Sequence, residues 1–95
     1  MLFAIYCTDK PDHVQVRMDN RPDHLEHLAG IGDRLKAAGP TTLDDGETPS
    51  GSIIIIEDEN IASARSFADA DPYHKAGLFQ SVEVRSFKWL LGTNK

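Results

Sequence analysis

The sequence predicts an α+β domain of the ferredoxin-like type, in which a repeated split βαβ unit forms one antiparallel sheet with two helices on one face. Apolar runs typical of strands alternate with two stretches of helical periodicity, in the order strand, helix, strand, strand, helix, strand. Turn-forming residues separate these runs. The length of 95 residues suits one hydrophobic core, so we expect a single domain spanning residues 1–95.

The first strand is predicted over Leu2–Cys7, which is apolar and rich in aromatic and β-branched residues. This composition is typical of a strand buried on both faces. Cys7, at its end, is predicted to be a buried structural thiol rather than a nucleophile. As the chain's one cysteine it excludes an internal disulfide and is compatible with a reducing compartment.

A long helix is predicted from Asn20 or Arg21 to Ala38. Proline is tolerated at the first helical position, so Pro22 is expected to mark its start, and Gly39-Pro40 its end. Residues 13–18 fit either an earlier start of this helix or a loop leading into it.

The next two strands are predicted to form a hairpin. Residues 41–43 are a short strand candidate, and an acidic turn over residues 44–51 leads into Ser52–Glu57. Four consecutive isoleucines within that second strand indicate a central position with both faces of the sheet covered.

The last part of the chain completes the repeat. Asn60 is a good cap for a second helix, which Pro72 breaks, and residues 71–79 are predicted to form a single helical turn and a bend. A final strand is expected over Ser81–Trp89, with Phe87 and Trp89 on one face.

Size and charge indicate the kinds of partner. A chain this short buries only about 60 to 65% of its unfolded surface, and its helices cover one side of the sheet. We therefore expect a homodimer that pairs two sheets into a barrel-like α/β assembly. The net charge of −5 opposes binding to nucleic acid or anionic membrane. The amino terminus shows neither basic flank nor cleavage site, which predicts a cytoplasmic protein.

His24 is the first candidate for a functional residue. At helical spacing it forms one stripe with Leu28, Ile31 and Leu35, so it extends the face that packs inward. A histidine pressed toward a core at the positive end of a helix is expected to be neutral unless a carboxylate lies close by. For this histidine alone, a packing role is the simpler interpretation.

Asp71 is the second candidate. An aspartate before a proline is a good cap for a short helix, which explains the residue without any function. In a split βαβ fold, however, the start of the first helix and the end of the second lie at the same end of the sheet, so Asp71 can approach His24. A carboxylate on one ring nitrogen fixes the tautomer and makes the other nitrogen a better base.

The sequence resembles the YciI-like, or YCII-related, family over nearly its whole length. The residues that carry this resemblance are Leu2–Tyr6, Arg21–Leu25 with Leu28, Ala38–Pro40 and Ala70–Leu78. The resemblance implies a ferredoxin-like dimer with an acid–base pair matching His24 and Asp71. One branch of the family is linked to removal of chloride from chlorinated aromatic compounds. The glycines at 30 and 32 and the acidic hairpin depart from the family's pattern and leave the choice of substrate open.

Together these features predict a small enzyme in which His24 is a general base or acid and Asp71 orients it, acting by proton abstraction with elimination or isomerisation on a small organic substrate. Arg21, Tyr6 and Tyr73 are candidate substrate contacts, although solvent exposure or packing explains each of them as well. The alternative is a non-catalytic dimeric domain that binds a small metabolite or serves another protein. No cofactor is predicted, and the spacing of the four histidines matches no zinc motif.

Overall fold

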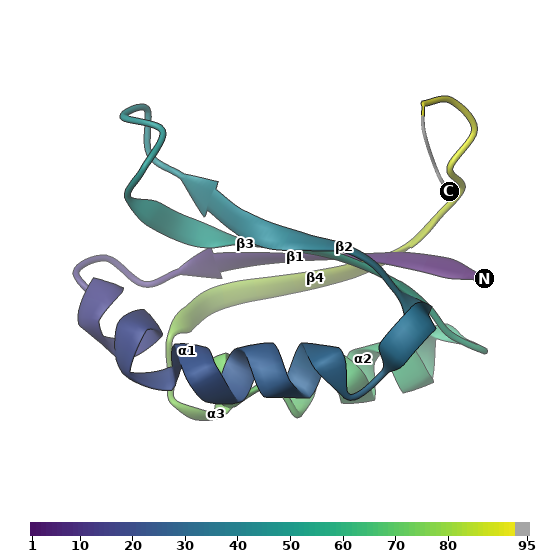
Figure 1. The fold of residues 1–95 in the computed structure, drawn as a ribbon, viewed down its shortest axis with the longest axis horizontal. Coiled ribbons are helices and arrows are strands. Elements are labelled where there is room, and N and C mark those ends of the chain that lie inside the picture. Colours follow the sequence, from purple (N-terminus) through teal and green to yellow (C-terminus); the bar gives the residue numbers. More distant parts are fainter. Residues whose placement is uncertain (93–95) are drawn as a thin grey trace.

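A computed structural model describes residues 1–92 and has two layers, a four-stranded antiparallel sheet and a layer of helices on one of its faces (Figure 1). The strand order is β2-β3-β1-β4. The strands are β1 (Leu2–Asp9), β2 (Leu35–Thr42), β3 (Pro49–Glu57) and β4 (Phe79–Phe87). The helices are α1 (Val14–Ala29), α2 (Ile61–Asp69) and the single turn α3 (Pro72–Lys75), with a short 3₁₀ turn at Gly32–Arg34. This architecture confirms the predicted ferredoxin-like fold.

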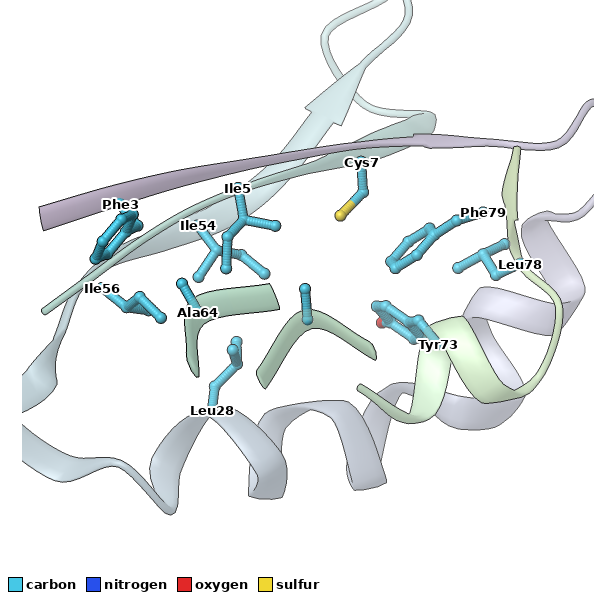
Figure 2. Close-up of a cluster of buried hydrophobic side chains, with 11 residues drawn as sticks. Phe3, Ile5, Cys7, Leu28, Ile54, Ile56, Ala64, Tyr73, Leu78 and Phe79 are labelled. Atoms are coloured by element: carbon cyan, nitrogen blue, oxygen red, sulfur yellow. The ribbon is translucent and has the colours of Figure 1, made fainter. Parts of the chain in front are cut away.

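The hydrophobic core lies between the sheet and the helices (Figure 2). Alternate residues of β1 and β3 point toward the helices because successive side chains of a strand face opposite sides. The helices cover the core from the other side, and residues at the start of β4 complete it at one end. Its buried members are Phe3, Ile5, Cys7, Leu28, Ile54, Ile56, Ala64, Ala68, Tyr73, Leu78 and Phe79.

The other face of the sheet is open within one chain. Tyr6 on β1 is 49% exposed, Ile53 on β3 is 47% exposed and Phe87 on β4 is 36% exposed. The prediction that Leu2–Cys7 and the isoleucine run are buried on both faces is therefore not met by the single chain, since only every second residue of these strands packs against helices.

The structure corrects the predicted start of the first helix. Helix α1 begins at Val14, so the ambiguous residues 13–18 belong largely to it, and Pro22 lies in its interior. Proline there removes one helical hydrogen bond, at a cost of about 3 kcal/mol. Pro22 is exposed on the side of α1 away from the core. His24 is therefore in the second half of the helix, and the expected influence of a helix amino terminus on it is absent.

The predicted end of that helix is also wrong. Helix α1 ends at Ala29 with Gly30 as its cap, and Gly32 adopts a positive φ of 55° in the following turn. Residues 35–42 form the edge strand β2, which includes Gly39 and Pro40. An edge strand tolerates proline because one side of it makes no ladder hydrogen bonds. Hydrogen bonding to the isoleucine strand therefore outweighs the local helical pattern.

The second half of the chain follows the prediction more closely. Asn60 caps α2, its side-chain oxygen accepting a hydrogen bond from the Ser63 amide at 2.8 Å. The predicted helical turn is α3. Strand β4 starts and ends two residues earlier than expected, so Trp89 lies beyond it. None of the helices within residues 1–92 is long and apolar enough to cross a membrane.

We predict that Gly51→Ala destabilises the fold by about 1–3 kcal/mol, because an added methyl group would overlap the backbone oxygen of Cys7 and lie 2.8 Å from Thr41 Oγ1. Urea unfolding measures this change. Gly39→Ala is the control, because a methyl group there meets nothing within 4 Å. Equal stability of the two variants would contradict the close approach of the strands at Gly51.

Candidate active site

His24 and Asp71 are in direct contact. His24 points from α1 toward the sheet, and its Nδ1 lies 2.9 and 3.0 Å from the two carboxylate oxygens of Asp71. Both side chains are buried. Because a carboxylate only accepts, Nδ1 carries a proton in this contact, and in the neutral form of the imidazole Nε2 has a free lone pair. Nε2 makes no hydrogen bond to any residue within 1–92.

Asp71 is held in place by a second role. It caps α3, where one carboxylate oxygen accepts a hydrogen bond from the Tyr73 amide at 2.9 Å and Pro72 occupies the first helical position. The predicted cap and the predicted contact with His24 are therefore both present, and the cap fixes the carboxylate that orients the imidazole.

Tyr73 packs against the imidazole of His24. Its ring stacks on the imidazole of His24, with centroids 3.9 Å apart and an angle of 14° between the planes. The guanidinium of Arg17 also contacts this ring, 4.6 Å from its centroid. Burial raises the pKa of the Tyr73 phenol, and the charge of Arg17 offsets this only in part. The phenol is therefore neutral and able to donate a hydrogen bond at physiological pH.

Arg17 is a buried charge that the sequence interpretation missed. Its Nε and Nη2 donate to the two oxygens of Asp9 at 2.8 and 2.9 Å, and Nη2 also donates to Ser52 Oγ at 3.1 Å. Burial lowers the pKa of Arg17, but the hydrogen bond and charge of Asp9 outweigh it and the pKa is raised. Arg17 thus stays charged and ties the end of β1 and the middle of β3 to α1.

These groups surround a pocket of about 260 Å³ between α1 and the β2–β3 side of the sheet. Most of its wall is apolar, and a few polar groups converge on it, as in many sites for small molecules. The residues that line it are Arg17, Met18, Arg21, His24, Leu25, Leu28, Ala38, Gly39, Pro40, Pro49, Ser52, Ile54 and Tyr73.

A larger hollow of about 520 Å³ lies over α2 and β4, with four charged residues and two valines along it. It contains neither a histidine nor a buried ionisable group and is more open to solvent. The pocket at His24 is therefore the better candidate, since perturbed and paired ionisable groups gather there.

Of the three predicted substrate contacts, the structure brings two to this pocket. Arg21 and Tyr73 line it together with His24. Tyr6 is elsewhere: its side chain points to the open face of the sheet, because the alternation of β1 sends Ile5 and Cys7 toward the helices instead. Tyr6 is thus no part of this pocket within one chain.

A predicted helix that began at Val14 would have placed Arg17 on the same face as His24. Arg17, Arg21, His24 and Leu28 recur at steps of three or four residues and form one face of α1. The prediction that the helix begins at Asn20 or Arg21 left Arg17 outside that face. Ser52 carried no signal of its own, since it is one small residue before an isoleucine run.

The remaining histidines are accounted for by other contacts. His27 bonds the Phe67 carbonyl oxygen at 3.0 Å and His13 that of Pro11 at 2.7 Å, whereas His74 lies 4.0 Å from Asp69. Within residues 1–92, no group of three histidine, cysteine or acidic side chains is arranged to hold a metal ion.

The fold and the pocket define a class: small ferredoxin-like α+β domains with a buried histidine–carboxylate pair facing a mainly apolar pocket. The model of the YCII-related domain matches residues 1–88, and the chain belongs to this family. Protein YciI of Escherichia coli O6:H1 is 41% identical, with 93% of this chain and 97% of that protein covered. A protein of Haemophilus influenzae is 36% identical over the same shares.

Solved structures of other proteins share this fold. The 5-chloro-2-hydroxyhydroquinone dehydrochlorinase of Burkholderia phenoliruptrix, solved in complex with 2,5-dihydroxybenzoquinone, superposes with a TM-score of 0.84 at 39% identity, covering 93% of this chain and 94% of that one. An antibiotic biosynthesis monooxygenase homologue from Bacteroides thetaiotaomicron has a TM-score of 0.60 at 14% identity, covering 100% and 93%, and shows the fold alone.

Cys7 is expected to be unreactive. Burial, followed by the charge of Asp71, raises the pKa of its thiol to about 12. The thiolate is the nucleophile, so alkylation by iodoacetamide at pH 8 is expected to be at least about a hundredfold slower in the folded protein than in urea. Mass spectrometry of the labelled chain measures both rates. Equal rates would show that the thiol is accessible and ionised in the folded state.

Proposed function

We propose that this chain is a small acid–base enzyme in which His24 transfers a proton and Asp71 orients it. The contact of Asp71 with Nδ1 carries this proposal, because it leaves Nε2 as a base directed at the pocket. The carboxylate also stabilises the positive charge that the ring acquires when Nε2 takes up a proton.

The reaction class that suits this arrangement is elimination or isomerisation. Nε2 removes a proton from the substrate, and the electron pair released forms a new double bond. In an elimination the leaving group departs with its own bonding pair, whereas in an isomerisation the proton returns to another atom. Both reactions are balanced without an oxidant or reductant, so the polar residues of the pocket suffice for the proton transfer.

A small oxygenated ring is the proposed substrate. A mainly apolar pocket of about 260 Å³ suits a flat molecule of this size, and Arg21 offers a positive charge to an ionised oxygen. The Burkholderia dehydrochlorinase, which is 39% identical, binds 2,5-dihydroxybenzoquinone. We extend to this chain the same class of ligand and the loss of hydrogen chloride from a chlorinated ring.

Chloride release from 5-chloro-2-hydroxyhydroquinone tests the catalytic proposal. His24→Ala is expected to lower kcat by about 10²–10⁴-fold, because the base is lost. Asp71→Asn should also lower kcat by about 10²-fold or more, because an amide no longer holds the proton on Nδ1, while asparagine still caps α3. His13→Gln is the control, since this histidine lies outside the pocket.

Two outcomes would count against this enzyme. Turnover by His24→Ala at the wild-type rate would remove the histidine from the mechanism. A wild-type protein that binds 2,5-dihydroxybenzoquinone but releases no chloride from the chlorinated ring would favour the alternative, a non-catalytic domain that binds a small metabolite.

We also propose that a second copy of the chain covers the open face of the sheet. Tyr6, Ile53 and Phe87 expose large apolar side chains there, and exposed apolar surface of this kind is typical of interfaces.

Analytical ultracentrifugation at micromolar concentration is expected to show a dimer, and Ile53→Glu to shift it toward monomer because a charge would be buried in the interface. Ile61→Glu, on the exposed start of α2, is the control and should leave the dimer intact. A well-folded wild-type monomer would show that the face stays open.

A further inference from the structure

We propose that Ser52, backed by Arg17, is the hydrogen-bond donor for a substrate oxygen on the side of the pocket away from His24. In this role its hydroxyl stabilises the negative charge that reaches this oxygen when Nε2 of His24 removes a proton. The inference rests on the proposed function and extends it to residues with no assigned role.

The buried ion pair beside Ser52 is the first observation. Arg17 is 5% exposed, and the Asp9 side chain is buried as well. Such a pair gives little net stability, because both charges lose their hydration, and apolar residues often replace it without loss. In the wall of a pocket, a fixed positive charge instead provides an electrostatic field at the bound molecule.

The hydrogen bonds of Ser52 are the second observation. Guanidinium groups only donate, so Ser52 Oγ must be the acceptor of its 3.1 Å bond from Arg17. The hydroxyl of Ser52 donates no hydrogen bond to residues 1–92, so its hydrogen is available. Ser52 is 2% exposed and lines the pocket, so a molecule bound there can accept this hydrogen bond. Donation by Arg17 makes this hydroxyl a stronger donor.

The separation of the two polar groups is the third observation. Arg17 and His24 are seven residues apart on α1, about 10 Å along the helix axis. The His24 imidazole and the Arg17 guanidinium both contact one ring, that of Tyr73, at 3.9 and 4.6 Å from its centroid, and both residues line the pocket. A molecule about as wide as one aromatic ring would have its acidic hydrogen near His24 and an oxygen near Ser52.

This arrangement narrows the substrate class. In this proposal His24 removes a proton at one end of the substrate, and Ser52 donates a hydrogen bond to an oxygen at the other end. The electron pair released must therefore reach that oxygen through the bonds of the substrate. Only a conjugated skeleton conducts it, as in a hydroxylated quinone, a phenol or an unsaturated ketone. The proton passes to Nε2, the pair moves through the double bonds, and the oxygen carries the negative charge next to the Ser52 hydroxyl.

Ser52→Ala tests the donor in two assays. We expect kcat for chloride release to fall by about 10²-fold, as with loss of one donor to a developing oxyanion, and the Kd for 2,5-dihydroxybenzoquinone to rise by about tenfold. Ser52→Thr, which keeps a hydroxyl, should restore part of both. Ser81→Ala is the control, because this serine is exposed on β4. Urea unfolding verifies that each variant is folded.

A double-mutant cycle tests the role of Arg17. Arg17→Lys keeps a positive charge beside Asp9 but loses the planar fork that reaches both Asp9 and Ser52. If Arg17 acts through Ser52, Arg17→Lys should lower kcat in the wild-type background and have little further effect in Ser52→Ala. Additive losses would mean that Arg17 acts independently of Ser52 and would overturn the backing role.

Failure of this inference is distinct from failure of the proposed function. Wild-type turnover and affinity in Ser52→Ala, with activity lost in His24→Ala, would overturn the donor and leave the acid–base enzyme intact. Full activity in His24→Ala would instead overturn the role of His24 as the base, and the affinity of Ser52→Ala for 2,5-dihydroxybenzoquinone would still decide whether Ser52 binds a ring oxygen. A wild-type protein that binds no such ring would overturn the substrate class.

Discussion

The contact between His24 and Asp71 is the interaction on which the site depends. The two residues are 47 positions apart, and their contact fixes α1 against the connection between α2 and α3. The same carboxylate starts α3 and so places Tyr73 under the imidazole. Packing, helix capping and orientation of the imidazole therefore depend on one side chain, and a substitution at Asp71 would affect all three.

A second buried pair, the ion pair of Asp9 and Arg17, also contacts Tyr73 through Arg17. Asp9 and Arg17 anchor the beginning of α1 to the end of β1, as His24 and Asp71 anchor its second half. Each buried charge has its partner within hydrogen-bond distance, which limits the cost of desolvation. Among the groups that line the pocket, Nε2 of His24 and the hydroxyl hydrogen of Ser52 make no hydrogen bond to residues 1–92 and are available to a bound molecule.

The sequence was sufficient to predict the order of the strands and helices and the contact between His24 and Asp71. Asp71, fixed by Pro72 at a helix start, and His24, on an apolar stripe, follow from local rules that the topology then combines. The boundaries of α1 were mispredicted because packing outweighs local preference: an exposed Pro22 is tolerated inside the helix, and pairing with β3 draws residues 35–42 into a strand. Arg17 was missed with the helix start, and Ser52 was missed because its proposed role depends on Arg17.

Strand β2 lies at the edge of the sheet, and its residues Ala38, Gly39 and Pro40 form one wall of the pocket. The groups proposed to act on the substrate come from α1, α3 and β3 instead. An outer strand has a neighbour on one side only, so its sequence and its hairpin can change with little effect on the core. A change in β2 would therefore alter the shape of the pocket while the side chains contributed by α1, α3 and β3 keep their positions.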